Sequence, residues 1–220
     1  MINPLLAGLA TTLFSLGAQA GIPVASYTMF DSVPHWNAYH DNLYNGTRHA
    51  NGLLTGGTGD LTDGVTSQSV AFGYGAWAPY VLWDGASPVI TFDLGTRHDL
   101  TSVTTYFKFY PSAAVYLPGS MGLRFSDDGV QFGSAQLRSL LPAERSPGGD
   151  DSNGVVQVLT APASARFVEL SLNQGAEGRW LALGEVVFQG AASPVPEPHA
   201  AWMGLLGLCA LLGLRQKRPA

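Results

Sequence analysis

Apolar and polar residues alternate with a period of two along much of the chain between residues 21 and 193. Val89–Leu94 alternates as a strand with one buried face does, and Thr101–Tyr110 is rich in β-branched and aromatic residues. Prolines and glycines separate such segments, and none of them has the 3.6-residue period of an amphipathic helix. The pattern predicts an all-β fold, an antiparallel β-sandwich with short turns.

Several further segments complete the expected sheets. Met121–Phe125 leads into a Ser-Asp-Asp-Gly turn at residues 126–129, whose glycine can adopt a positive φ. The other expected strands are Val130–Phe132, Val155–Thr160, Arg166–Leu172 and Trp180–Gln189, with a polar loop at Leu140–Asn153. The only cysteine, Cys209, lies beyond these segments. The stability of the sandwich must therefore come from its apolar core rather than from disulfides.

The first 20 residues carry no charged side chain and contain a hydrophobic stretch from Leu5 to Leu16. Ala18-Gln19-Ala20 then forms a small-x-small cleavage site before Gly21. We expect residues 1–20 to be a signal peptide. An uncleaved N-terminal helix is the alternative, because no Lys or Arg precedes the hydrophobic stretch.

The C-terminal end has three parts in a fixed order. Residues 191–198 form a Pro-rich linker that ends in the motif Val195, Pro196, Glu197 and Pro198. Residues 199–214 are uncharged apart from His199 and predict a short transmembrane helix. Residues 215–220 form a basic tail with Arg215, Lys217 and Arg218, which should stay cytoplasmic by the positive-inside rule. The preceding part of the chain is then exported.

This order of proline motif, short apolar helix and basic end resembles the PEP-CTERM sorting signal of exported bacterial proteins. The resemblance implies an exosortase-type membrane sorting enzyme as a partner, and an association with exopolysaccharide, biofilm and extracellular matrix. It also implies an inner-membrane-anchored precursor that later reaches the cell surface or the extracellular space. A plain membrane anchor that follows a proline-rich linker is the alternative.

The charge balance of the exported part excludes one class of partner. Three of the 11 Lys and Arg residues lie in the basic tail, and one of the 16 acidic residues is Glu197. The exported part therefore has 8 basic and 15 acidic residues, a net charge near −7. Nucleic acids and anionic membrane surfaces require a basic patch, so we expect neither as a partner.

Five motifs occur in the order found in the discoidin, or coagulation-factor C-type, branch of the galactose-binding-like domains. They are Leu61–Thr66, Val89–Gly95, Phe125–Gly129, Ala165–Leu170 and Trp180–Val186. The resemblance covers residues 53–190, and residues 21–52 are then an N-terminal strand and loop segment of the same sandwich. It implies an eight-stranded antiparallel jelly roll whose loops at one end bind a ligand, often a sugar.

Members of this family often hold a structural calcium ion beside the first strand. The resemblance assigns this role to Asp63, Thr66 and Glu185, with backbone carbonyls near Leu61 completing the shell. Oxygen ligands of these kinds suit Ca²⁺. Alternatively, Asp63 and Gly64 form only a turn, and Glu185 pairs with an arginine such as Arg166.

A sugar site needs an exposed aromatic ring with polar groups nearby. Trp77 and Tyr80 are the candidates, because they lie in a Gly-rich segment where rings could be exposed. The resemblance also implies a structural tryptophan in this region, which favours Trp83, or Trp77, as a core residue. Trp180 opens a strand and is expected in the core.

No catalytic motif is recognisable. The spacings of His35, His40 and His49 match no zinc-helix motif, so solvated loop histidines are expected there. We therefore expect a non-enzymatic, surface- or matrix-associated protein that binds carbohydrate through its loops. The alternative is a structural or adhesive matrix component with no specific sugar binding.

Overall fold

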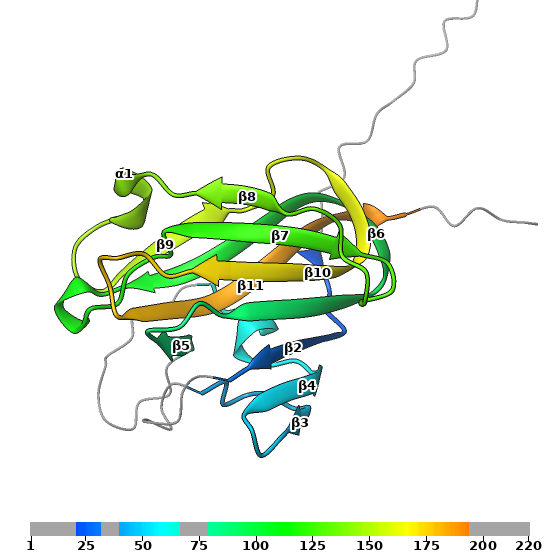
Figure 1. Ribbon diagram of the computed structural model, residues 1–220, viewed down its shortest axis with the longest axis horizontal. Coiled ribbons are helices and arrows are strands. Elements are labelled where there is room, and N and C mark those ends of the chain that lie inside the picture. Colours follow the sequence, from blue (N-terminus) through cyan, green and yellow to red (C-terminus); the bar gives the residue numbers. More distant parts are fainter. Residues whose placement is uncertain (1–20, 32–39, 67–78, 194–220) are drawn as a thin grey trace, which may run out of the picture.

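The computed structural model describes residues 21–31, 40–66 and 79–193, and these form a two-layer β-sandwich (Figure 1). All strand pairings between the named strands are antiparallel. The expected all-β antiparallel sandwich is thus confirmed. The described part has 11 strands rather than the eight that the resemblance implied.

The first sheet has the order β3-β4-β2-β6-β10-β7-β8. Its strands are β3 (Thr47–Arg48), β4 (Leu53–Gly57), β2 (Ser26–Phe30), β6 (Val89–Phe109), β10 (Ala163–Asn173), β7 (Ser120–Ser126) and β8 (Gln136–Ser139). The second sheet contains β11 (Trp180–Ala192), which pairs on one side with β6 and on the other with β1 (Gly21–Ile22) and β5 (Val81–Asp84). Strand β9 (Ser152–Gln157) pairs with the other edge of β6. Three short helical turns complete the elements: η2 (Asp60–Thr62), η3 (Pro111–Ala113) and α1 (Pro142–Arg145).

Strand β6 belongs to both sheets, which makes it the centre of the fold. Its first part pairs with β2 and β10, where Asp93 lies opposite Ser26 and Phe167. Its last part pairs with β11 and β9. Gly95 lies between the residues that pair with β2 and those that pair with β11, whereas β10 pairs with β6 on both sides of it. Its φ of +77° is a left-handed conformation that glycine adopts without steric cost.

The core fills the space between the sheets. Fully buried apolar side chains come from both layers: Ile90, Phe92, Val103, Phe107, Leu123, Val168, Leu170 and Leu183. Phe92 and Phe188 make a direct edge contact, with ring centroids 5.1 Å apart. Such edge-to-face contacts add to the stability that burial alone provides.

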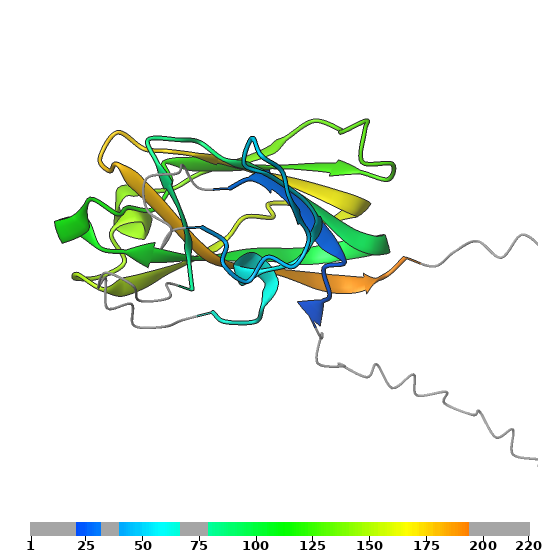
Figure 2. The same ribbon diagram turned by 90° about the horizontal axis from the view of Figure 1, so that it is seen from below.

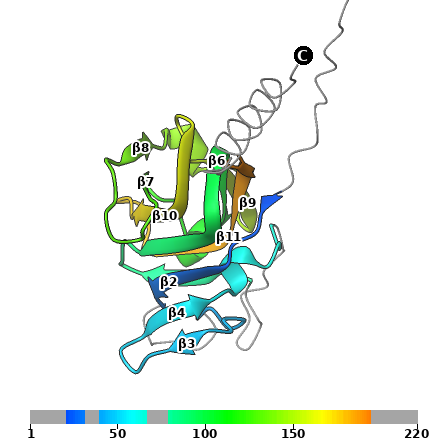
Figure 3. The same ribbon diagram turned by 90° about the vertical axis from the view of Figure 1, so that its right-hand side faces the viewer.

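Strands β2, β4 and β3 extend the first sheet beyond β6, as the end-on view shows (Figure 3). The segment from Tyr27 to Asn51 thus contributes most of β2 and all of β3 to the sheet. Its polar side chains build the network described below.

One expected strand is wrong. Val130–Phe132 forms no strand, because side chains in the preceding turn take up its backbone donors. Asp128 Oδ1 accepts hydrogen bonds from the amides of Val130 and Gln131, both at 2.8 Å. Side chains of this kind offer the backbone an alternative to a sheet ladder. The turn itself is as expected, with Gly129 at φ +72°.

Strand β1 lies beside the end of β11, with Gly21 opposite Gln189, so the described chain enters and leaves on one side of the sandwich (Figure 2). Within residues 21–31, 40–66 and 79–193, no helix has the length and apolar character needed to cross a membrane. The expected signal peptide, sorting motif, transmembrane helix and basic tail lie outside the described residues.

Candidate functional site

Two of the three residues proposed for calcium lie together. Glu185 is buried on β11 and accepts a hydrogen bond from the amide of Gly64 at 3.1 Å. Asp63 is exposed, and its Oδ1 accepts a hydrogen bond from the amide of Val65 at 2.8 Å. Burial first, and then the nearby Asp63 carboxylate, raise the pKa of Glu185 to about 8. The third residue, Thr66, is partly buried two residues beyond Gly64.

The alternative partner of Glu185 is wrong. The Arg166 guanidinium donates two hydrogen bonds to Asp93, Nε to Oδ1 and Nη2 to Oδ2, both at 2.8 Å. This bidentate pair lies between β10 and the first part of β6. Arg166 therefore links β10 to β6, and the neighbours of Glu185 are Asp63 and Gly64 instead.

The candidate ligand atoms around Glu185 are oxygens, the type of ligand that Ca²⁺ prefers. The causes that shift the pKa of Glu185 are burial, the Gly64 amide and Asp63, and no cationic side chain is among them. The nearby hydroxyl oxygen of Thr62, on η2, is buried and has no hydrogen-bond partner. In the part of the chain that the structure describes, no cluster of three His, Cys, Asp or Glu side chains could hold a metal. Hydroxyl and carbonyl oxygens would therefore have to complete the coordination, as Ca²⁺ allows.

The expected aromatic platform is not formed by Tyr80. Its side chain is 2% exposed and packs with Leu82, Val115 and Ala182, because β5 brings it against β11. Its hydroxyl donates a hydrogen bond to Asn153 Oδ1 at 3.0 Å. Tyr80 is thus a core residue rather than an exposed ring, and Trp77 lies outside the described residues.

The two tryptophans in the described residues, Trp83 and Trp180, differ in burial. Trp83 is buried, as expected, and its indole N–H donates a hydrogen bond to the carbonyl of Phe30 at 3.2 Å. Trp180 is only partly buried, and the Arg179 guanidinium lies 5.6 Å from the centre of its ring. Trp180 was expected in the core, and it packs against buried residues but remains partly exposed.

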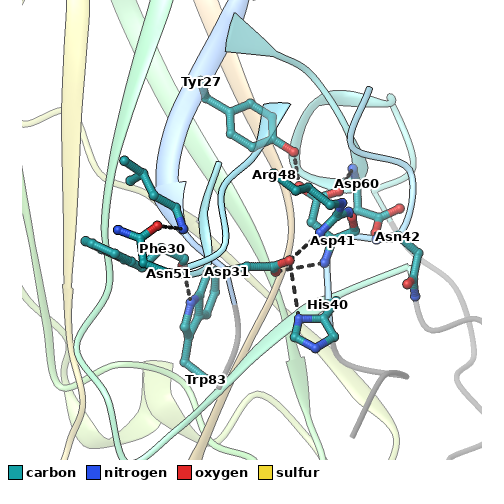
Figure 4. A network of polar contacts seen from close by, with 11 residues as sticks. Tyr27, Phe30, Asp31, His40, Asp41, Asn42, Arg48, Asn51, Asp60 and Trp83 are labelled. Atoms are coloured by element: carbon teal, nitrogen blue, oxygen red, sulfur yellow. Dashed lines mark hydrogen bonds and ion pairs between the residues drawn. The ribbon is translucent and has the colours of Figure 1, made fainter. Parts of the chain in front are cut away.

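Polar side chains of the segment after β2 converge on one carboxylate, that of Asp31 (Figure 4). Its Oδ1 accepts the amide of Asp41 at 3.1 Å, and its Oδ2 lies 2.5 Å from Arg48 Nη1 and 3.3 Å from His40 Nδ1. The Asp31 side chain is only 6% exposed, whereas those of His40 and Arg48 are 23% and 40% exposed. One buried carboxylate therefore holds two partly exposed side chains, and Arg48 Nη2 also donates a hydrogen bond to the carbonyl of Asp41.

A second, fully buried layer supports this arrangement. Asp41 accepts hydrogen bonds from the hydroxyl of Tyr27 and, at 2.9 Å, from the amide of Asp60. Asp60 in turn accepts the amide of Asn42 at 2.9 Å. Burial raises the pKa of Asp41, and burial together with the Asp41 charge raises the pKa of Asp60 to about 7. Burial, followed by the same charge, also raises the pKa of the Tyr27 hydroxyl.

The backbone is fitted to this buried layer at Gly59. A Cβ atom there would lie 2.2 Å from Asp41 Oδ1 and 2.8 Å from the Tyr27 hydroxyl oxygen. Because both atoms are locked in hydrogen bonds, only glycine fits without displacing the network. The network thus fixes the path of the chain between β4 and η2.

An exposed aromatic residue, Phe30, directly precedes Asp31 in the chain. Phe30 ends β2 with 60% of its surface exposed, because it follows the buried Met29 in the strand alternation. We name Phe30, Asp31, His40 and Arg48 the Asp31 site. His40 and Arg48 of this site are held by Asp31, and Phe30 adds an exposed apolar ring on the neighbouring residue. An apolar ring, a guanidinium and an imidazole are groups that suit a ligand with both apolar and hydroxyl-bearing faces.

Sequence reasoning missed this site, although it noted His40 among the loop histidines. Its members are separated by 9 and 17 positions from Asp31 and form no local motif. The sequence feature that could have indicated the site is Phe30, an apolar residue at a strand end that is followed by the acidic Asp31. The expectation of a merely solvated histidine is wrong for His40, which is paired with Asp31.

No family model and no curated protein matches this sequence. Among solved structures, a Streptococcus pneumoniae fucose binding module is similar over 81% of this chain and 99% of its own, with 13% identity and a TM-score of 0.46. The chitosan-binding module 1 of a chitosanase/glucanase from Paenibacillus sp. IK-5 is similar over 79% of this chain and 100% of its own, with 11% identity and a TM-score of 0.45.

A truncated AlyQ with CBM32 and alginate lyase domains is similar over 81% of this chain, with 13% identity and a TM-score of 0.45. This chain spans 35% of that protein's length. At such identities the likeness concerns the fold alone.

Proposed function

We propose that this chain is an exported, non-enzymatic protein that binds carbohydrate through the Asp31 site. The observation that carries the proposal is that one buried carboxylate, Asp31, holds the partly exposed side chains of His40 and Arg48, while the preceding residue, Phe30, has an exposed ring. A sugar ring offers a C–H face to an aromatic ring and hydroxyl oxygens to charged donors. Because the donors are already oriented, little side-chain freedom is lost on binding.

A glycan array tests this proposal. The exported protein is expected to retain at least one glycan, and Phe30→Ala to weaken that binding about tenfold, close to the upper range for an aromatic contact. Arg48→Ala should weaken it by a similar factor, because the guanidinium is lost and Asp31 loses one of its partners. Affinities of purified variants by titration calorimetry are the measurement.

Leu137→Ala is the matched control. Leu137 is an equally exposed apolar residue, but it lies on β8 at the opposite edge of the same sheet. Its variant should bind as the parent protein does. If no glycan is retained, or if all three variants bind equally well, the Asp31 site is not a sugar site, and the structural or adhesive role is favoured.

The sorting route is part of the same proposal. Residues Val195, Pro196, Glu197 and Pro198 are recognised outside the membrane by an exosortase-type enzyme, and the chain is cut nearby. Proline keeps such a segment extended and accessible, which supports this role. The processed protein then reaches the cell surface or matrix. Peptides of the released protein that contain Trp202 or Arg218 would contradict the cleavage.

A calcium ion held by Asp63 and Glu185, with Thr66 and nearby carbonyl oxygens, completes the proposal. Calcium would neutralise the two adjacent carboxylates and tie η2 to β11. Calcium should therefore raise the melting temperature of protein purified with chelator, by a stabilisation of about 2.7 kcal/mol at one hundred times its dissociation constant. The shift should be larger at pH 8 than at pH 5, because Glu185 must lose its proton to bind the ion.

Glu185→Gln is the control for calcium, since the amide oxygen can still accept the hydrogen bond from Gly64. Its melting temperature should not respond to calcium. Magnesium should have little effect on either protein, because it demands a stricter octahedral shell. An equal calcium shift in Glu185→Gln would place the ion elsewhere.

A further inference from the structure

Lys108 is the only lysine between residues 21 and 193, and its side chain is completely buried. It lies near the end of β6 between the buried residues Phe107 and Phe109. Burial of an ammonium group is costly unless its partners are well placed. The Asp31 site makes no use of this group, which lies at the opposite end of β6 from Val89.

Two polar side chains, those of Asp151 and Asn153, contact the Lys108 ammonium. Nζ lies 2.5 Å from Asp151 Oδ1 and donates a hydrogen bond to the Asp151 carbonyl at 3.0 Å. It also lies 3.5 Å from Asn153 Oδ1. The same amide oxygen accepts the hydroxyl of the buried Tyr80 at 3.0 Å.

The sheet fixes this geometry. Lys108 of β6 lies directly opposite Asn153 of β9, so their side chains project from the same face of the sheet. Asp151 precedes β9 with φ +63°, a left-handed conformation that non-glycine residues adopt rarely. A backbone held in this way keeps the carboxylate on Nζ.

We propose that Lys108 and Asn153 become joined by an intramolecular isopeptide bond after the chain has folded. Asp151 takes a proton from the Lys108 ammonium, and the free amine attacks the side-chain carbonyl carbon of Asn153. This carbon is one bond from the oxygen that lies 3.5 Å from Nζ, so the reacting atoms are close to attack distance. The new bond joins Nζ to Cγ.

The remaining steps balance without any further reagent. Negative charge develops on Asn153 Oδ1, where the Tyr80 hydroxyl stabilises it, as an oxyanion-hole donor does. Asp151 then returns its proton to the departing side-chain nitrogen, which leaves as ammonia. The product is an amide between the two side chains, the second Lys108 proton is released, and nothing is oxidised or reduced.

Such a bond would suit this domain. Residues 21–193 contain no cysteine, so no disulfide can staple the sandwich. The bond would connect β6 to its edge strand β9 and close the connection between them. It does not depend on carbohydrate binding, and either proposal can fail alone.

Mass spectrometry of the full-length protein after denaturation and tryptic digestion tests the inference. Trypsin is expected not to cleave after Lys108, and residues 98–124 should be recovered joined to residues 146–166. The mass of the joined peptide should be lower than that of its two parts by one ammonia. Separate peptides ending at Lys108 and Arg166, with an unchanged Asn153, would overturn the proposal.

Variants separate the roles of the three side chains. Asp151→Asn should reduce the yield of joined peptide at least tenfold, because the proton acceptor is lost. Tyr80→Phe should slow its formation, and Asn153→Ala should abolish it. A joined peptide that lacks one water instead of one ammonia would assign the bond to Asp151 and overturn the assignment to Asn153.

One side reaction has the same mass change and needs its own control. Asn153 precedes Gly154, and such a pair can form a succinimide with loss of ammonia, but this leaves the peptide 146–166 separate. Ammonia loss of that kind should persist in Lys108→Arg, whereas the joined peptide should vanish. Loss of ammonia without joining in the parent protein would count against the proposal.

Discussion

Replacement of Asp41 by alanine is expected to lower the free energy of unfolding by about 3–5 kcal/mol. Asp41 is completely buried and accepts hydrogen bonds from the Tyr27 hydroxyl and the Asp60 amide. Alanine would leave both buried donors without a partner and open a small cavity between β2 and η2. Chemical denaturation with a constant m value is the measurement.

Two comparisons make this result specific. Asp127→Ala removes an exposed carboxylate that is paired with Arg97, and should change stability by less than about 1 kcal/mol. Tyr27→Phe removes the other half of the buried hydrogen bond. Because the two residues are in contact, the double variant should lose less than the sum of the single variants. A loss below about 1 kcal/mol for Asp41→Ala would show that the network contributes little to stability.

The fold was predictable from the sequence because strand alternation is a local property. Val89–Leu94 and Thr101–Tyr110 carry the pattern, and both lie in β6. What could not be predicted is that they form one strand shared by two sheets, since β11 replaces β2 as a partner around a single glycine, Gly95. Residue alternation alone was misleading for Val130–Phe132, because the backbone amides of Val130 and Gln131 donate to the side chain of Asp128 instead of to a neighbouring strand.

The site was less predictable, since burial and polar contacts are set by tertiary neighbours. Tyr80 follows a Gly-rich segment, which suggested exposure, but the pairing of β5 with β11 buries it. Phe30 has no such cover and is exposed. Asp63 and Glu185 were brought together by a family resemblance rather than by spacing, as they are far apart in sequence.

The stability of the calcium-free protein is expected to fall by a few kcal/mol between about pH 4 and pH 8. Two carboxyl groups set this direction. The folded state raises the pKa of Asp60 from 3.8 to about 7, and that of Glu185 from 4.5 to about 8. Their protonated forms are favoured in the fold, so their contribution is fully present below pH 4 and is lost as the pH rises through 7 and 8. Partial solvent access reduces the size of the effect.

Other groups act in the opposite direction at lower pH. Asp93 has a lowered pKa, because Arg166 donates hydrogen bonds to its charged form, and burial opposes this only in part. Its contribution is present above its ordinary pKa near 4 and is lost as the pH falls below that range. The melting temperature of the calcium-free protein should therefore be highest near pH 4–5. A maximum at pH 7 or above would contradict the buried, protonated state of Asp60 and Glu185.

Variants and calcium distinguish the contributions of Asp60 and Glu185 to the pH dependence of stability. Asp60→Asn should remove the loss of stability that extends to about pH 7. Glu185→Gln should remove the loss of stability that extends to about pH 8. Saturating calcium should remove only the Glu185 part, since an ion at Asp63 and Glu185 favours the ionised carboxylates. The part due to Asp60 should remain, because its raised pKa comes from burial beside Asp41 in a separate network. The same melting curves thus report independently on the buried acids Asp41 and Asp60 and on the calcium proposal.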